Sequence, residues 1–220
     1  EVEKIVTEVV EVEKEVVKEV EKEVEVVITA TPDPAAATLG GTLTYVINQE
    51  GSTLDPGQSK YAVELMIQYQ IYDQLLWLDS GINLQPGLAT SWTHNDDYTV
   101  FDFELRDDVT FHDGEPFNAD AVVSWYERIM DPEFPIGAIV RYVDQIDTVE
   151  KTGDYAVRFT LKNPNILWLR EVAYGYSGIG SPKATAELGE EFGTNPVGSG
   201  PFIFVEWLPG SHVTLKKNPD

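Results

Sequence analysis

The histidines and nearby acidic residues are the side chains of this sequence that could hold a metal ion or transfer a proton. The three histidines are His94, His112 and His212. They are too far apart in the chain to form the closely spaced ligand pair of a zinc site on a helix or loop. His112-Asp113 with Glu115 could hold a hard cation for a metal-dependent hydrolase, but Asp-Gly-Glu-Pro is first of all typical of a tight turn. We therefore expect a turn here and no metal site.

Paired carboxylates, phosphate loops and nucleophiles give no stronger signal. The Asp-Asp pairs at 96–97 and 107–108 are sequence neighbours in loops, whereas the carboxylates of a glycoside hydrolase face each other across a cleft. Residues 175–180 have their glycines in the wrong order for a dinucleotide loop, and no Gly-Lys-Ser/Thr occurs. Residues 198–201 lack the spacing of a nucleophile elbow, and there is no cysteine. The sequence predicts a protein that is not an enzyme and uses no cofactor.

Composition excludes further classes of protein. The chain of 220 residues has 38 acidic and 15 basic side chains, a formal net charge of −23, which repels the phosphates of nucleic acids. Hydrophobic residues make up 42% and aromatic residues 11%, as in a folded globular body. No run of eighteen apolar residues occurs that could span a bilayer. We expect most aromatic side chains in a core and some in the wall of a ligand cleft.

The first 38 residues differ from the rest. Residues 1–28 consist almost wholly of Glu, Val and Lys, and their apolar residues follow a heptad pattern that slips by one residue. A helix, a coiled coil and a frayed extended stalk all remain open, because valine also suits a strand. Residues 29–38, with two prolines, have the composition of a linker. We expect residues 1–38 to be a spacer and residues 39–220 to be the folded body. A stalk that drives oligomers would make the protein an adhesive or scaffold protein, which is an alternative function.

The body alternates strand and helix patterns without a regular βαβ rhythm, which favours a mixed sheet with flanking helices. Strands are expected at residues 42–47, 101–105 and 155–161, and a closing hairpin at 202–207 and 212–215 around Pro209-Gly210. Helices are expected at residues 61–78, at 118–130 with Asn118 as the N-cap, and near 184–192. The first of these helices is apolar around most of its circumference, so we expect it to be buried on several sides.

Three blocks of the body occur in a familiar order. They are residues 41–56, from Gly-Thr-Leu-Thr-Tyr-Val to Thr-Leu-Asp-Pro; residues 84–122, with Leu-Gln-Pro-Gly-Leu-Ala-Thr-Ser-Trp and Phe-Glu-Leu-Arg-Asp-Asp-Val-Thr-Phe-His-Asp-Gly-Glu-Pro-Phe-Asn-Ala-Asp-Ala-Val; and residues 195–220, from Asn-Pro-Val-Gly-Ser-Gly-Pro-Phe to Lys-Asn-Pro-Asp. Together these blocks resemble the family 5 extracellular solute-binding proteins, the dipeptide, oligopeptide and nickel binders of ABC importers. The resemblance covers residues 39–220.

This resemblance implies an α/β (mixed α+β) fold, a lobe of the type II periplasmic-binding-protein class that is incomplete because the second lobe is absent. It implies that the loop after the first strand, Gln49, Glu50, Gly51 and Ser52, offers backbone groups to an extended ligand. An exposed turn is the alternative for this loop, because Gly and Ser are common in turns. The turn at His112 and the Gly-rich residues 198–201 are expected to be structural.

The resemblance also implies the protein's partners and location. The expected ligand is a small peptide or similar solute, and the expected protein partners are the permease subunits of an ABC transporter. The Val-Glu-Lys stalk is similar to those that follow the lipidated cysteine of some bacterial lipoproteins. The protein is therefore expected to be exported to the cell surface or periplasm and anchored in the membrane by an N-terminal lipid outside this chain.

Overall fold

The computed structural model describes residues 40–219. Contacts within the chain divide it into two compact units, Glu1–Val46 and Ile47–Asp220. The expected stalk, the linker and the boundary after residue 38 all lie outside the described residues. The strand expected at 42–47 is wrong: these residues are not in a strand, and Leu43 is 92% exposed. A strand requires a neighbour for its backbone groups, and no described residue pairs with this segment.

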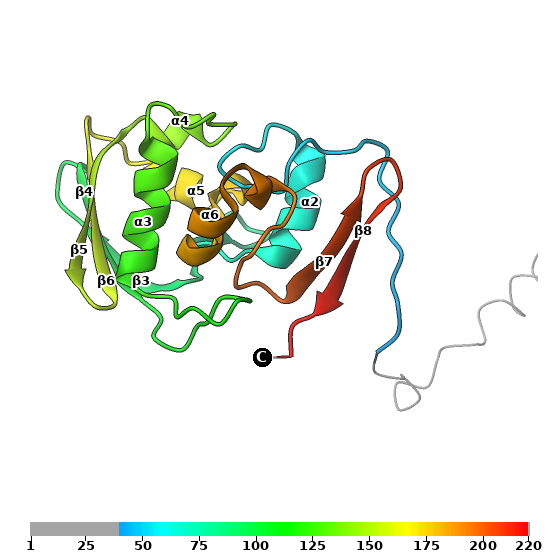
Figure 1. Ribbon diagram of the computed structural model, residues 1–220. Coiled ribbons are helices and arrows are strands. Elements are labelled where there is room, and N and C mark those ends of the chain that lie inside the picture. The colour runs from blue at the N-terminus through cyan, green and yellow to red at the C-terminus, as the bar shows by residue number, and fades with distance from the viewer. Residues whose placement is uncertain (1–39, 220) are drawn as a thin grey trace, which may run out of the picture. The chain divides into compact units, whose positions relative to one another are not determined.

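A four-stranded antiparallel sheet forms one side of the second unit (Figure 1). Its strands are β3 (Ala89–His94), β4 (Val100–Leu105), β5 (Ile146–Gly153) and β6 (Ala156–Leu161), in the order β3-β4-β6-β5. Phe101, Phe103 and Leu105 of β4 are buried, and so are Val157 and Phe159 of β6. This period-two burial confirms the strand patterns predicted from the sequence.

Helix α3 (Ala119–Met130) covers this sheet and contacts β5, β6 and α6 (Figure 1). It begins at the predicted N-cap, where the Asn118 side chain accepts a hydrogen bond from the backbone N–H of Ala121 at 3.0 Å. Its predicted apolar face is buried, including Trp125 and Ile129. Several aromatic rings of the core pack edge to face, as in the pair Tyr126–Phe159 with ring centres 4.8 Å apart.

The helix expected at residues 61–78 is shorter than predicted. Helix α2 runs over Ala62–Ile71, and Leu76–Leu78 forms strand β1, which pairs with β2 (Leu84–Pro86). The helix ends because Tyr72 is extended and its hydroxyl donates a hydrogen bond to a carbonyl of the loop before α2. The expectation of burial on several sides is also wrong, because Met66 is half exposed and the buried face includes polar side chains.

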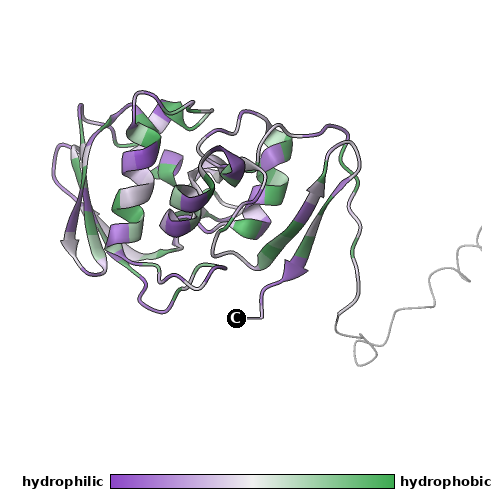
Figure 2. Ribbon diagram, in the orientation of Figure 1, coloured by the Kyte–Doolittle hydropathy of each residue, from purple (hydrophilic) through white to green (hydrophobic). Residues whose placement is uncertain are grey.

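The remaining elements are short helices and the C-terminal hairpin. The helices are α4 (Val140–Val143), α5 (Trp168–Val172), the 3-10 turn η2 (Gly175–Ser177), α6 (Pro182–Leu188) and the 3-10 turn η3 (Gly189–Gly193). The predicted hairpin is confirmed as β7 (Phe202–Leu208) and β8 (His212–Lys217), and Figure 2 shows β7 coloured hydrophobic over much of its length. Helices and sheets thus combine as expected, but every strand pair among the described residues is antiparallel rather than mixed.

Candidate functional site

The loop of residues 49–52, expected to bind ligand, lies between helix α2 and the turn of the β7–β8 hairpin. Gln49, Glu50 and Ser52 are exposed, and Gly51 is partly buried. Within the described residues, the backbone N–H and C=O groups of Gln49, Glu50 and Gly51 have no hydrogen-bond partner. Free backbone donors and acceptors on an exposed segment can pair with the backbone of a second chain or a peptide.

Glu64 of α2 fixes the C-terminal end of this loop with its buried carboxylate. Its Oε1 accepts hydrogen bonds from the backbone N–H of Ser52 at 2.7 Å, from Ser52 Oγ at 3.0 Å and from the backbone N–H of Thr53 at 3.3 Å. Its Oε2 accepts from the backbone N–H groups of Lys60 at 2.8 Å and Tyr61 at 3.0 Å. One carboxylate therefore joins the loop to the start of the helix.

These hydrogen bonds outweigh the cost of burying a charge. Burial by itself would raise the pKa of Glu64, but the backbone N–H groups of Tyr61, Ser52 and Lys60 donate to the carboxylate and hold the pKa below its ordinary value of 4.5. Glu64 is therefore ionised at neutral pH inside the fold. The negative charge also lies in the first turn of α2, where the helix dipole stabilises it.

A second carboxylate fixes the N-terminal end of the loop. Glu50 Oε1 accepts hydrogen bonds from the indole N–H of Trp207 at 3.0 Å and from the backbone N–H of Gly210 at 2.8 Å. Both donors belong to the β7–β8 hairpin, so the Glu50 side chain is directed to the protein itself. What Glu50 can offer to a ligand is its backbone, in agreement with the kind of contact predicted for this loop.

The chain directly after the loop is joined to the core by an ion pair. Asp55 is 1% exposed, and its Oδ2 lies 2.6 Å from a guanidinium nitrogen of Arg128 on α3. The other oxygen of Asp55 accepts from the backbone N–H of Gly57 at 2.9 Å. The guanidinium also lies over the ring of Phe134, 4.5 Å from its centre. These contacts hold the segment between loop and helix against α3.

Tyrosines gather where η2 contacts α2. Tyr174 precedes η2 and Tyr176 lies within it, with ring centres 5.9 Å apart, and the ring centre of Tyr69 of α2 lies 5.8 Å from that of Trp77. Burial and then the neighbouring Tyr174 raise the pKa of Tyr69, and burial, Tyr174 and the charge of Glu64 raise that of Tyr176. Aromatic side chains with partial exposure are common walls of small-molecule sites. No pattern in the sequence distinguishes these tyrosines from the others.

The turn at His112 has a structural role. The backbone N–H of His112 donates to the carbonyl of Gly198 at 2.8 Å, and the ring Nε2–H donates to the carbonyl of Gly200 at 2.9 Å. Burial lowers the pKa of His112, although the bond to Gly200 partly opposes this. A Cβ on Gly198 would lie 2.1 Å from the carbonyl oxygen of Ile71, so only glycine fits there. The turn at His112 and the Gly-rich residues 198–201 thus both have a structural role, as expected.

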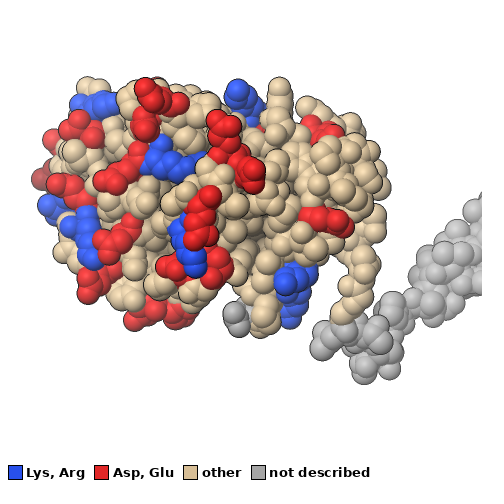
Figure 3. All heavy atoms as spheres, in the orientation of Figure 1, with Lys and Arg blue, Asp and Glu red and all other residues tan. Residues whose placement is uncertain are grey.

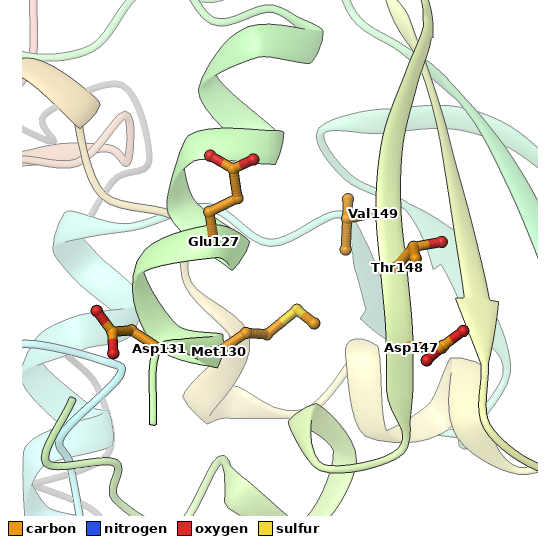
Figure 4. A pocket seen from close by; sticks show the side chains of 6 residues that line it. All are labelled: Glu127, Met130, Asp131, Asp147, Thr148 and Val149. Carbon is orange, nitrogen blue, oxygen red and sulfur yellow. The ribbon is translucent and has the colours of Figure 1, made fainter. Parts of the chain in front are cut away.

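The other acidic residues in the described part of the chain do not gather into a metal-binding group. No group of three or more His, Cys, Asp or Glu residues suited to a metal ion occurs within residues 40–219. A shallow hollow of about 460 Å³ between α3 and β5 has Glu127, Asp131 and Asp147 at its rim (Figure 4). Figure 4 shows their carboxylates pointing in different directions. This arrangement does not provide the facing carboxylates that acid–base chemistry requires.

Charge is unevenly distributed on the face shown in Figure 3. Acidic side chains are numerous over α3 and the four-stranded sheet, and few charged side chains lie over α2 and the β7–β8 hairpin. The candidate loop contacts these last two elements through Ser52 and Glu50. The loop is therefore next to the less charged part of this face. Among the described residues, no helix is both long enough and apolar enough to cross a membrane.

Comparison with known proteins identifies the family to which this chain belongs. The family described as "Bacterial extracellular solute-binding proteins, family 5 Middle" matches residues 83–220, more than half of the chain. The chain therefore belongs to the family 5 extracellular solute-binding proteins, which are solute-binding proteins and not enzymes. The resemblance noted in the sequence is confirmed.

Two relatives illustrate the range of the family. The chain is 31% identical over 156 residues to Di/tripeptide-binding protein 2 of Pseudomonas aeruginosa, covering 61% of this chain and 29% of the relative. It is 31% identical over 166 residues to the glutathione-binding protein GsiB of Escherichia coli K12, covering 76% of this chain and 32% of the relative. The chain thus spans about a third of the length of the curated relatives it matches.

Solved structures show the same fold. The periplasmic binding protein DppA of Helicobacter pylori, in complex with the peptide STSA, matches with a TM-score of 0.70 at 30% identity over 78% of this chain and 38% of that chain. NikZ of Campylobacter jejuni, in complex with Ni(L-His), matches with a TM-score of 0.67 at 31% identity over 77% of this chain and 34% of that chain. The predicted fold class, part of a type II periplasmic-binding-protein fold, is confirmed.

Sequence reasoning missed Glu64, although one signal was available. A Glu at the third position of a helix commonly accepts a hydrogen bond from the N-cap backbone, as Glu64 does here from Tyr61. That signal identifies a helix start but not the second half of the contact, with Ser52 and Thr53. The partner loop lies eleven to twelve residues away and is brought to the helix only by folding.

Proposed function

We propose that this chain forms one wall of the ligand-binding cleft of a solute-binding protein that serves an ABC importer, and that the ligand is a peptide or peptide-like solute. Family membership supports the class of function, and relatives named as peptide-binding proteins support the class of ligand. No covalent chemistry is part of this proposal. ATP hydrolysis would belong to a partner of the importer.

The observation that carries the proposal is the set of unpaired backbone groups at Gln49, Glu50 and Gly51, on a loop fixed at both ends. A ligand that pairs with backbone groups is recognised by its amides rather than by its side chains. Such a site tolerates many peptide sequences. In this proposal a second lobe closes over the bound peptide, and the importer recognises the closed state.

Location and anchoring follow from the same proposal. The family is described as extracellular, so we propose that this protein is exported and acts outside the cytoplasmic membrane. A lipid attached ahead of the residues 1–38 spacer would keep it near the permease. Partition of the natural protein into the detergent phase, reversed by removal of the lipidation signal, is the expected result for such an anchor.

Calorimetric titration of the protein encoded by the gene tests the ligand class. We expect binding of a dipeptide and of the tetrapeptide Ser-Thr-Ser-Ala, and much weaker binding of the same tetrapeptide with N-methylated backbone amides. The methylated peptide is the control, because it keeps every side chain and replaces the backbone N–H donors by N-methyl groups. Glutathione and the nickel–histidine complex serve as competing ligands. Binding of the nickel complex without any peptide, or equal affinity for both tetrapeptides, would contradict the proposal.

A further inference from the structure

Glu64 is fully buried and charged, yet it makes no ion pair with any residue in the range 40–219; each hydrogen bond that it accepts there comes from the segment between Ser52 and Tyr61. Buried charges are normally paired with an opposite charge or bound to a metal. A carboxylate satisfied almost wholly by backbone N–H groups acts instead as a fixed acceptor that determines where those groups lie. The position of Glu64 therefore determines the path of the chain around it.

The two carboxylate oxygens of Glu64 bind different segments. Oε1 accepts hydrogen bonds from the backbone N–H groups of Ser52 and Thr53 at the end of the candidate loop, and Oε2 accepts them from the backbone N–H groups of Lys60 and Tyr61 at the start of α2. An amide in place of the carboxylate could accept at one oxygen only, because its nitrogen is a donor and would face another donor. The arrangement thus requires a carboxylate at this position.

The loop also lies directly on the Glu64 side chain. A Cβ added to Gly51 would lie 2.5 Å from Cγ of Glu64 and 3.2 Å from its Oε1. Any residue larger than glycine at position 51 must displace either the loop or the carboxylate. Glu64 is in this way in contact with the middle of the loop as well as with its end.

Glu50 completes the support from the other side. Its carboxylate is fixed by Trp207 and Gly210 of the hairpin, so the unpaired backbone between Glu50 and Ser52 is held at both ends. Holding a binding segment in its bound conformation reduces the entropy lost when a ligand binds. The two anchors differ in strength, because Glu64 is buried and Glu50 is exposed to water.

We propose that Glu64 is the positioning residue of the peptide-binding loop: it does not contact the ligand, but its buried carboxylate holds the backbone of Gly51–Ser52 in the conformation that pairs with a peptide. This inference rests on the proposed function, and it names the residue on which the affinity of that loop depends. It also assigns a reason for glycine at position 51.

The test measures peptide affinity and amide hydrogen exchange in three variants of the protein encoded by the gene, with Ser-Thr-Ser-Ala as the probe. Glu64→Gln keeps the size of the side chain and should weaken binding about tenfold or more, since a hydrogen bond to a charged group is worth at least that factor. Gly51→Ala disturbs the same contact, because its methyl group would collide with the Glu64 side chain, and it should also weaken binding. The amides of Ser52 and Thr53 should exchange faster in both variants.

Gln68→Met is the matched control. Gln68 lies one turn further along the same buried face of α2, but its side chain donates its hydrogen bond to Ser59 rather than to the candidate loop. We expect the affinity of Gln68→Met for the peptide to stay within about twofold of the wild type, because this substitution leaves Glu64 and its hydrogen bonds to the loop unchanged. Amides of the four-stranded sheet, such as that of Phe103, should exchange at the wild-type rate in every variant.

The outcomes separate this inference from the proposed function. If the wild-type protein binds the peptide and Glu64→Gln binds it with the same affinity, the positioning role is wrong and the proposed function stands. If the wild-type protein binds no peptide, the proposed function fails, and unchanged exchange at Ser52 in Glu64→Gln would show that Glu64 does not order the loop either. If Glu64→Gln does not fold, Gly51→Ala decides, because alanine removes no hydrogen-bonding group.

Discussion

Glu64 Oε1 lies 2.7 Å from the backbone nitrogen of Ser52, so a buried carboxylate of α2 is in direct contact with the loop proposed to bind peptide. The contact gives the loop a defined conformation before any ligand arrives. Under the proposed function, it also makes both the stability of the fold and the affinity for ligand depend on the ionised form of a single side chain.

The first prediction concerns acid stability. The pKa of Glu64 is below 4.5 in the folded protein, so the unfolded chain takes up a proton at a higher pH than the folded chain does. The stabilisation by Glu64 is therefore complete above about pH 5 and is lost as the pH falls through its folded pKa. Glu64→Gln should lower the free energy of unfolding by about 2 kcal/mol at pH 7, measured by urea denaturation. This difference should shrink at about pH 3, and a constant difference would contradict the assignment.

The second prediction concerns His112. Burial lowers its pKa below the ordinary 6.5, so the unfolded chain binds a proton that the folded chain does not. Stability should fall as the pH decreases below about 6.5, with a slope of up to about 1.4 kcal/mol per pH unit from this group. His112→Gln retains a donor for the carbonyl of Gly200 and should remove this slope. Denaturation at pH 7 and about pH 5.5 measures the slope of the unfolding free energy with pH. An unchanged slope in the variant would show that another group titrates.

The third prediction concerns the ion pair of Asp55 and Arg128. Removing the cation leaves the buried carboxylate of Asp55 without its charge partner. Arg128→Met should therefore cost about 3 kcal/mol of unfolding free energy, measured by thermal or urea denaturation. The double variant Asp55→Asn with Arg128→Met should be less destabilised than Arg128→Met alone, because no charge then remains buried. Additive losses in the double variant would mean that the two side chains do not interact.

The fourth prediction compares two glycines. Gly198→Ala places a methyl group against the backbone of Ile71, which cannot move without breaking the end of α2, so we expect a loss of about 3 kcal/mol. Gly114→Ala meets no atom within 4 Å but has a φ of +88°, so only backbone strain of about 1 kcal/mol is expected. Urea denaturation of both variants checks the order, and equal losses would show that the close approach at Gly198 costs no more than the strained backbone angle at Gly114.

Much of the fold was predictable from local signals. The helix after Asn118 combines an N-cap with an apolar face of the right period, and the β7–β8 hairpin has a Pro-Gly turn between two apolar runs. The end of α2 was not predictable in this way. The run that includes Leu76 and Leu78 is apolar and short, so its period does not distinguish helix from strand, and its pairing with β2 decides.

The candidate site was predictable only in outline. The resemblance of ordered motifs pointed to Gln49, Glu50, Gly51 and Ser52, and these residues form an exposed loop with free backbone groups in the structure. Binding of a ligand by these four residues stays a prediction. The expected strand at 42–47 failed for a different reason, because a strand pattern states only that a segment can pair and not that a partner is present.

By itself the sequence determined the family, the α3 helix, strands β4 and β6 of the four-stranded sheet and the strongly acidic net charge, because each depends on residue types and on spacing along the chain. Only the tertiary structure decided that Glu64 supports Ser52 and that Glu50 contacts Trp207, 157 residues further along the chain. A side chain's type gives its capacity to accept hydrogen bonds, but the donors that it meets are chosen by the packing of distant segments.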